Sequence, residues 1–308
     1  MCGSLGFERK ELAQVKKSNL TSTIVLVLLW GLSWPIYKIG LHDAPPILFA
    51  GLRTMLGGIV LVIVGLRNLR ELQFANKWPI YLISSLFNVI LFFGLQTVGL
   101  SFLPSGLFSV LVYLEPVLVG LMAWLWLGER LTPLKGVGLI LGFLGVAAVS
   151  EAGLTGHTTV AGIVLGIVTA VVWAIGTIYV KVVQSRVNLM WLVAVQFVIG
   201  GAVLTAVGSG VERWSAIVWS GSFIATLLYG ALFGVSLSWV LWIRMVRTGE
   251  VSRVSSYTFF VPLISVFVGT FILHEPITAF LISGLILIVV SIYLVNRPKI
   301  TSRIVTIR

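Results

Sequence analysis

Long apolar stretches separated by short charged gaps dominate the chain. A helix needs about 20 residues to cross the roughly 30 Å hydrocarbon core of a bilayer. Ten stretches of suitable length carry one charge or none: Leu20–Tyr37, Pro46–Leu66, Trp78–Leu103, Ser105–Gly128, Thr132–Ser150, Thr158–Val180, Val187–Val211, Trp214–Ile243, Val254–Leu273 and Pro276–Asn296. Strands of a membrane barrel would be only about 10 residues long and would alternate in polarity. The pattern therefore predicts an all-α integral membrane protein with ten transmembrane helices.

The basic residues test this count, because Lys and Arg collect in the cytoplasmic segments of membrane proteins. With a cytoplasmic amino terminus, all of the 21 lysines and arginines except Lys38, Arg53 and Arg213 fall in segments assigned to the inside. A wrong count would mix the two classes beyond the point of error. We therefore expect a multi-pass protein of the cell (plasma or inner) membrane with both termini cytoplasmic.

The two halves of the chain resemble each other at a nearly constant offset. Pairs separated by 143 and then 146 residues are Trp30/Trp173, Lys38/Lys181, Arg53/Gln196, Pro116/Pro262 and Gly138/Gly284. Each half holds five predicted helices, an odd number, so equivalent helices would cross the membrane in opposite senses. Inverted repeats of this kind frame the substrate site of many transporters, although a duplication can also serve stability alone.

The repeat divides the chain into four parts. We expect a cytoplasmic amino-terminal segment over residues 1–19 and a first five-helix repeat over 20–157. A second five-helix repeat follows over 158–296, and a basic cytoplasmic tail over 297–308. The gaps between apolar stretches are too short for a separate soluble domain or a nucleotide-binding motor.

Composition also favours lipid as the surroundings of this chain. Hydrophobic residues make up 58% of it and charged residues 10%, against about 25% charged in soluble domains. Topology signals and anionic lipid explain the net charge of +11 better than nucleic acid does. The single cysteine, Cys2, and three scattered histidines form no metal-binding pattern. We expect a small-molecule substrate, no cofactor, no metal and no nucleic acid, and we leave a homodimer open.

Glu115 is the sole acid deep inside an apolar stretch, about 15 Å along its helix at 1.5 Å per residue. An ionisable group at that depth is costly and usually faces a cavity or a partner. One hypothesis assigns Glu115 to proton coupling or to a substrate amine. The other pairs it structurally with Arg53, which enters the membrane from the same side. Both residues are therefore candidates for a coupling site.

Other polar and aromatic side chains within the helices allow two interpretations. Lys38 and Lys181 either extend to the interface or mark the two mouths of a transport pathway. Aromatic residues either anchor the interface, which suits Tyr37 and Tyr179, or line a pocket. The candidate substrate-binding residues are Trp34, Asn88, Tyr113, Trp173, Gln196 and Tyr257.

Pro116 and Pro262 lie within predicted helices. A proline there removes one backbone hydrogen bond and favours a kink. Because these two prolines match each other in the repeat, we expect paired hinges at both positions.

The sequence resembles the EamA-type transporters of the drug/metabolite transporter superfamily over about residues 20–296. The residues that carry the resemblance are Trp30-Gly-Leu-Ser-Trp-Pro, Arg53, Glu115-Pro116, Leu127-Gly128-Glu129-Arg130-Leu131-Thr132 and the second copy Pro262 with His274-Glu275-Pro276-Ile277-Thr278. The second copy departs from the pattern, because Val261 replaces Glu115 and His274 replaces a glycine. The resemblance implies a ten-helix bundle of two inverted repeats that moves metabolites such as amino acids or drugs, commonly outward.

These observations favour a secondary active transporter that exports small organic metabolites by alternating access, with proton coupling through Glu115 as an added hypothesis. An alternative is an intramembrane enzyme acting on lipid or isoprenoid. Such an enzyme needs a clustered catalytic set, whereas the apolar stretches hold one deep acid and no mid-span histidine. A non-transporting assembly or sensor protein fits poorly with the near absence of extramembrane mass. We therefore expect a protein that is not an enzyme.

Overall fold

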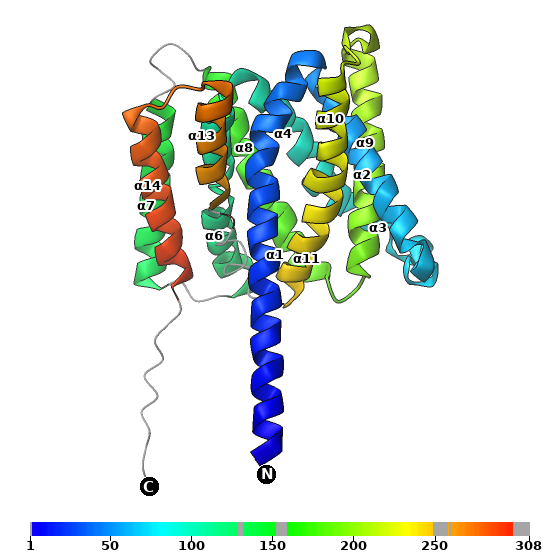
Figure 1. Ribbon diagram of the computed structural model, residues 1–308, viewed down its shortest axis with the longest axis vertical. Helices are drawn as coiled ribbons and strands as arrows, with labels where there is room; N and C mark the ends of the chain where they lie inside the picture. The colour runs from blue at the N-terminus through cyan, green and yellow to red at the C-terminus, as the bar shows by residue number, and fades with distance from the viewer. Residues whose placement is uncertain (1, 129–131, 152–158, 249–257, 259, 298–308) are drawn as a thin grey trace.

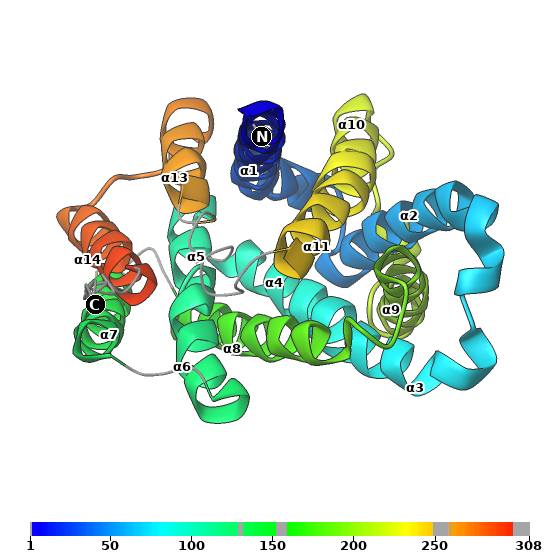
Figure 2. The ribbon, with the colours of Figure 1, turned by 90° about the horizontal axis from the view of Figure 1, so that it is seen from below.

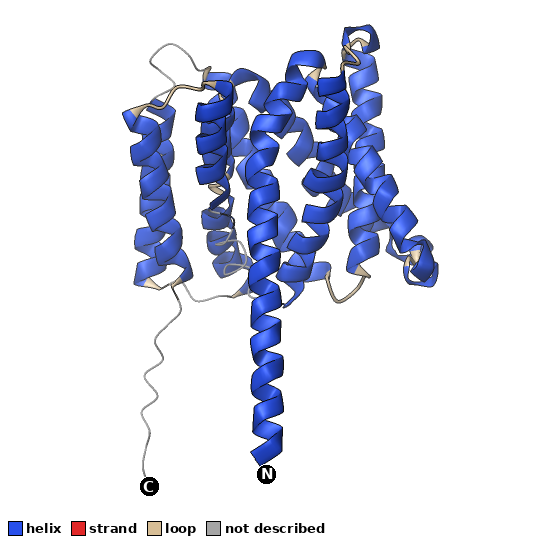
Figure 3. Ribbon diagram, viewed as in Figure 1, coloured by secondary structure: helices blue, strands red, loops and turns tan. Residues whose placement is uncertain are grey.

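The computed structural model describes residues 2–128, 132–151, 159–248, 258 and 260–297, a part of the chain that is almost entirely helical and has no strand (Figure 3). The first half contains α1 (Cys2–Asp43), α2 (Pro46–Gly65), η1 (Leu66–Glu71), α3 (Phe74–Ser85), η2 (Leu86–Leu91), α4 (Phe92–Phe102), α5 (Ser105–Val112), α6 (Glu115–Leu127) and α7 (Pro133–Glu151). The second half contains α8 (Val160–Val183), α9 (Leu189–Val211), η4 (Trp214–Ala216), α10 (Gly221–Tyr229), η5 (Gly230–Leu237), α11 (Ser238–Thr248), α13 (Phe260–Leu273) and α14 (Ala279–Asn296).

Seven helical segments in the described residues are long and apolar enough to cross a membrane. They are Thr21–Asp43, Pro46–Glu71, Phe74–Phe102, Ser105–Leu127, Val160–Val183, Leu189–Val211 and Gly221–Arg247. The three remaining predicted stretches contain the shorter apolar helices Pro133–Gly145, Phe260–Leu273 and Ala279–Ser291. The prediction of an all-α, multi-pass membrane fold is confirmed in this coarser form.

The outer surface of the bundle explains why the sequence is so apolar. Large hydrophobic side chains stand exposed on most of the helices, among them Ile63, Leu125, Val164 and Phe271. Soluble proteins rarely leave apolar patches of this extent open to water. Acyl chains of a bilayer would cover them at no cost in free energy.

Equivalent helices of the two halves pack against each other. α2 and α9 make the most extensive contact, and α7 and α14 form a second pair at the edge of the bundle (Figure 2). Gly58 and Gly201, which match in the repeat, allow the α2 and α9 backbones to approach closely. A Cβ added at Gly58 would lie 2.6 Å from the backbone nitrogen of Val198. Only residues without a side chain fit such an approach.

The first helices of the two halves run in opposite directions. α1 ends, and α8 begins, at the upper end of the bundle in Figure 1. α1 begins and α14 ends toward the lower end of the same view. Because α1 begins and α14 ends on one side of the bundle, the fold is compatible with both chain ends on the same side of a membrane.

The third long helix of each half contains a π-helical stretch. η2 joins α3 to α4, and η5 joins α10 to α11. The last residues of these stretches, Leu91 and Leu237, are 146 residues apart, which is the offset of the sequence repeat. π-helical turns are rare and occur frequently at functional sites. The repeat therefore extends to an unusual feature of the backbone.

Pro116 follows an interruption within the apolar helical segment Ser105–Leu127. Tyr113 departs from helical dihedral angles, Leu114 keeps them, and Pro116 is the second residue of α6. Proline is well tolerated there because the N–H that it lacks would have no helical partner. The interruption falls in the turn before Pro116, where a proline removes a backbone hydrogen bond, so it is compatible with the predicted bend, and the hinge at Pro116 stays a prediction. Pro262 is the third residue of α13.

Two other boundaries differ from the sequence-based expectation. α1 extends back to Cys2, so residues 2–19 continue the first helix. The predicted stretch Trp214–Ile243 begins with the short η4 helix and a loop, and α10 starts only at Gly221, after an amino-terminal cap by Ser220. The serine hydroxyl satisfies a backbone N–H that the helix cannot satisfy itself.

Candidate functional site

A cavity lined mainly by aromatic side chains lies between the two halves. Its lining residues are Trp30, Ser33, Trp34, Tyr37, Phe92, Phe93, Gln96, Tyr113, Trp173, Gly234 and Trp239. The enclosed volume is about 20 Å³, which is roughly the space needed for one water molecule. The cavity is therefore too small for an organic solute unless its walls move.

Trp173 of α8 is central to the aromatic wall. Its ring centroid lies 5.6 Å from that of Trp30, 5.5 Å from Tyr113 and 5.1 Å from Phe92. The first two contacts have edge-on geometry, which aromatic quadrupoles favour. The indole nitrogen of Trp173 is buried without a hydrogen-bond partner. An indole N–H in that position can donate to a ligand.

Arg53 of α2 lies directly behind this wall. Its guanidinium is 0% exposed, and its Nη2 donates to Gln96 Oε1 at 3.1 Å and to Thr97 Oγ1 at 2.6 Å. The Tyr37 ring covers the guanidinium, with 3.7 Å between Cζ and the ring centroid. Cation–π contact of this kind stabilises a desolvated arginine. Nε and Nη1 have no hydrogen-bond partner.

Glu115 is the first residue of α6 and is also 0% exposed. Its Oε1 accepts a hydrogen bond from Thr177 Oγ1 at 3.0 Å, and its Oε2 has no partner. A carboxyl group at a helix amino terminus is favoured by the helix dipole. Thr177 lies one helical turn after Trp173 on α8, so the same face of α8 holds Glu115 and forms the cavity wall.

Arg53 and Glu115 do not pair with each other. Among the described residues the one ion pair within 4.0 Å joins His42 and Asp43. The structural pair between Arg53 and Glu115, one of the two interpretations of these residues, is therefore not formed in this conformation. Each charged side chain is held by neutral hydroxyl or amide groups and keeps unpartnered polar atoms.

The two repeat-related lysines hold equivalent positions. Lys38 Nζ donates to the carbonyl oxygens of Leu100 at 2.8 Å and Leu103 at 2.9 Å, at the end of α4. Lys181 Nζ donates to the carbonyl oxygen of Val246 at 3.4 Å, near the end of α11. Leu100 and Val246 are 146 residues apart, so the repeat relates these two contacts. A cation near a helix carboxyl terminus is electrostatically favourable.

A wide vestibule of about 650 Å³ opens beside Lys38. Its lining residues are Lys38, Ile39, His42, Asp43, Ser101, Phe102, Leu103, Pro104, Ser222, Leu273, His274, Glu275 and Pro276. Lys38 follows Trp34 by one helical turn on α1, so one face of α1 passes from the cavity to the vestibule. The polar contacts around Lys38 therefore lie between the two spaces.

Acids of the second half cap helices of the first half. Glu275 accepts from the backbone N–H of Ser105 at 2.6 Å and of Gly106 at 3.1 Å, at the start of α5. Glu212 accepts from the backbone N–H of Ile47 and Leu48 at the start of α2. Such caps satisfy N–H groups that a helix leaves open. Glu275 lines the vestibule, whereas Glu212 does not.

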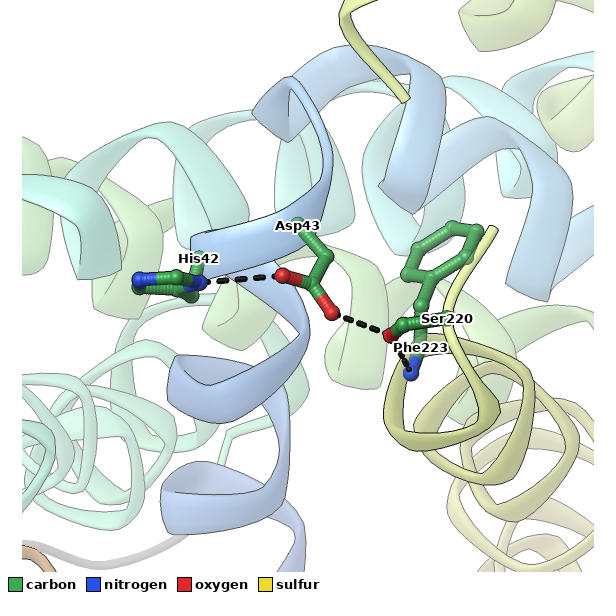
Figure 4. A network of polar contacts seen from close by, with 4 residues as sticks. All are labelled: His42, Asp43, Ser220 and Phe223. Carbon is green, nitrogen blue, oxygen red and sulfur yellow. Dashed lines mark hydrogen bonds and ion pairs between the residues drawn. The ribbon is translucent and has the colours of Figure 1, made fainter. Parts of the chain in front are cut away.

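A second contact ties the rim of the vestibule to α10 (Figure 4). One carboxylate oxygen of Asp43 lies 2.9 Å from His42 Nδ1, and the other accepts a hydrogen bond from the Ser220 hydroxyl. The same hydroxyl accepts from the backbone N–H of Phe223 at 2.9 Å. The end of α1 is thereby joined to the start of α10, across the boundary between the halves.

The structure brings together half of the predicted substrate-binding residues. Trp34, Tyr113 and Trp173 line the cavity. Asn88 and Gln196 instead meet at Ser84, which donates to Gln196 Oε1 and accepts from Asn88 Nδ2. Tyr257 lies outside the described residues.

Several cavity residues were missed by sequence reasoning. Tyr37, assigned to the interface, is buried against Arg53. With Trp30, Ser33 and Trp34 it follows the i, i+3, i+4, i+7 spacing of one helix face, a signal that was present in the sequence. Gln96 is a polar amide within an apolar stretch, which also marks it as a candidate for substrate binding. Phe92 and Trp239 gave no comparable signal, because their roles depend on packing between distant helices.

Sequence comparison decides the family. The EamA-like transporter family matches the chain twice, over residues 18–151 and 160–297. The chain belongs to the EamA-like transporter family. It is accordingly a membrane transporter and not an enzyme, as its sequence predicts. The double match also confirms that the chain consists of two related halves.

Relatives of this EamA-like chain extend over most of its length. The uncharacterized transporter YvbV of Bacillus subtilis is 50% identical over 271 residues, which cover 88% of this chain and 89% of that protein. A probable amino-acid metabolite efflux pump of Escherichia coli is 26% identical over 285 residues, covering 88% and 92%. One crystal structure matches with a TM-score of 0.68, covering 90% of this chain and 96% of that chain. At 21% identity it shows the fold alone.

Proposed function

We propose that this EamA-like protein is a secondary active transporter that exports small organic metabolites by alternating access. The observation that carries the proposal is the aromatic cavity, which both halves line and beside which Arg53 and Glu115 are buried with unpartnered polar atoms. Substrate sites of inverted-repeat transporters lie near the midplane where the repeats meet. Buried polar groups without partners are costly, which favours a role in recognition over one in stability.

The proposal treats residues 20–157 and 158–296 as five-helix repeats of opposite orientation, ten spans in all, with both chain ends in the cytoplasm. The basic residues of the interhelical segments support this orientation. The opposite directions of α1 and α8 support it as well (Figure 1). Two similar halves in opposed orientation can exchange conformations, which gives inward-open and outward-open states of similar energy.

In this orientation the vestibule beside Lys38 faces outward. Lys38 bonded to the end of α4, and Glu275 bonded to the start of α5, then close the outer mouth in this conformation. Lys181 marks the inner mouth. The small volume of the cavity supports a state in which neither mouth admits solute.

Proton coupling is assigned to Glu115, whose buried carboxyl group has one oxygen without a partner. Intramembrane carboxyl groups in such settings often relay protons. Export is supported by the related Escherichia coli protein, which is named a probable amino-acid metabolite efflux pump. An inward proton gradient would then drive solute outward.

Flux into proteoliposomes tests the proposal. Purified protein should show saturable counterflow for members of a panel of amino acids and related metabolites. Trp173→Ala removes the centre of the cavity wall, so flux should fall by about tenfold or more, as for the loss of a buried aromatic anchor. Trp214→Ala, a matched control at an exposed tryptophan outside the cavity, should leave flux unchanged. Absence of saturable flux for every solute, or equal loss in both variants, contradicts the proposal.

A further inference from the structure

Arg53 is a buried cation that forms no ion pair with any acid among the described residues. Its side chain is fully enclosed, and no acid among the described residues lies within 4.0 Å of its nitrogen atoms. An arginine keeps its positive charge at neutral pH. A buried charge is normally paired or bound to a ligand. Arg53 therefore carries a buried positive charge that no acid among the described residues neutralises.

The hydrogen bonds of Arg53 orient the guanidinium without neutralising it. Gln96 and Thr97 both accept from Nη2, and both are uncharged. A guanidinium has five N–H donors, and those on Nε and Nη1 have no acceptor. The protein therefore fixes the Nη2 edge of the guanidinium, while the N–H groups on Nε and Nη1 remain available to a ligand. Fixing a planar donor group in this way prepares it to receive an anion.

Arg53 is separated from the cavity by a single layer of side chains. Tyr37, Phe93 and Gln96 all line the cavity, and all three contact the guanidinium as a stacked ring, a neighbouring ring or a hydrogen-bond acceptor. A rotation of the Tyr37 ring would bring the guanidinium to the cavity wall. A solute group entering from the cavity would then meet Arg53 directly.

The π-helical stretch of the second half leaves space for this side chain. A Cβ added at Gly230 would lie 3.3 Å from Arg53 Cδ, and one added at Gly234 would collide with the Tyr37 hydroxyl. Both glycines belong to η5. The glycine backbone of η5 therefore lies against both Arg53 and Tyr37, so both halves contribute to the space that the arginine occupies.

We propose that Arg53 binds the carboxylate of the transported solute, while the tryptophan and tyrosine rings hold an apolar or aromatic body. This inference rests on the proposed function, because it assigns the charge of the solute in the same cavity. A carboxylate supplies the negative charge that Arg53 lacks and acceptors for its open N–H donors. A purely cationic or neutral solute supplies neither and leaves Arg53 uncompensated.

Matched solute pairs test this assignment by binding, without any need for transport. Cavity tryptophans report binding through their fluorescence in detergent-purified protein. The probes are 3-phenylpropionate and phenylalanine, each compared with its uncharged or cationic amide. The wild type should bind each carboxylate at least about tenfold more tightly than its amide, as expected for a charge-assisted contact.

Arg53→Gln gives the first half the residue that the second half has at Gln196, and it should abolish the preference for the carboxylate. Arg53→Lys keeps the charge and should retain part of that preference, which guards against a variant that fails to fold. Arg67→Gln removes a positive charge from an exposed position just beyond α2 and should leave the preference intact.

Several results would overturn the inference. Equal binding of carboxylate and amide by the wild type would do so, as would an unchanged preference in folded Arg53→Gln protein or failure of every carboxylate to bind. Binding of carboxylates with the predicted preference, but without counterflow in proteoliposomes, would contradict the proposed function and leave the Arg53 assignment standing. Counterflow that does not depend on the carboxylate of the solute would contradict the Arg53 assignment and leave the proposed function standing.

Discussion

The first and second halves of this transporter share a framework but differ in buried charge. In both halves a lysine near the end of the first helix donates to a carbonyl near the end of the third, and the third helix contains a π-helical stretch. Arg53 and Glu115 occur in the first half, where the second half has Gln196 and Val261. The elements that both halves share would allow the two halves to exchange conformations. The charged side chains that only the first half has make the surroundings of the cavity chemically asymmetric.

The surroundings of the unshared positions follow the same division. Gln196 accepts from Ser84 and so belongs to the packing between helices. Val261 is fully buried in the core. Arg53 and Glu115 lie near the cavity wall, each with polar atoms that no described protein group satisfies, and Gln196 Nε2 is unpartnered as well. The two halves therefore differ in buried charge, which the proposals above assign to a ligand and to a proton.

Glu115→Val should have the largest effect, because it makes the first half like the second at this position. Flux in proteoliposomes should fall about 100-fold, which is roughly 2.8 kcal/mol at about 1.4 kcal/mol per tenfold step. Glu115→Gln keeps the hydrogen bond with Thr177 and should retain flux that no longer depends on pH. Wild-type pH dependence in the glutamine variant would remove Glu115 from proton coupling.

Glu275→Ala should have an intermediate effect on the outer mouth. An amino-terminal cap contributes about 1 kcal/mol, so its loss should lower the ratio of closed to open protein about fivefold. The measurement is the rate at which a thiol reagent labels Ser33→Cys in a Cys2→Ser background, applied from the vestibule side.

Glu212→Ala is the matched control for that experiment. It removes an equivalent cap from α2, at a place that does not line the vestibule. Thermal stability should fall by a similar amount in both variants, but labelling of residue 33 should rise only for Glu275→Ala. A rise in both would mean that Glu275 supports the fold in general and does not close the mouth.

The lysine pair should give the smallest effects, in opposite directions. A cation at a helix carboxyl terminus contributes about 0.3–1 kcal/mol, so Lys38→Met and Lys181→Met should each shift the labelling ratio between the two sides by about two- to fivefold. Lys38→Met should favour labelling from the vestibule side and Lys181→Met from the other side. Shifts in the same direction would contradict the assignment of the lysines to two mouths.

Much of the framework could be predicted from sequence, because lipid exposure imposes long apolar stretches and the repeat sets an offset. Trp34, Tyr113 and Trp173 were among the candidate pocket residues because they are aromatic side chains within predicted helices, and all three line the cavity. Tyr37 could have been identified from its spacing along the α1 face.

Other features could not be predicted from the sequence. The cap that Glu275 forms on Ser105 joins residues 170 positions apart. The isolation of Arg53 from Glu115 depends on helix rotations that no local pattern sets. The position of the break at Tyr113 could not be predicted from Pro116 alone, because proline is accepted both at a helix start and at a bend.

The most direct test of alternating access uses the Ser33→Cys reporter at the cavity, in the Cys2→Ser background that leaves it as the sole thiol. Membrane-impermeant reagent would be applied to right-side-out and to inside-out vesicles, with and without a transported solute. We predict labelling from both sides and protection by solute on both. Labelling from one side alone, or labelling that solute does not change, would contradict transport through this cavity.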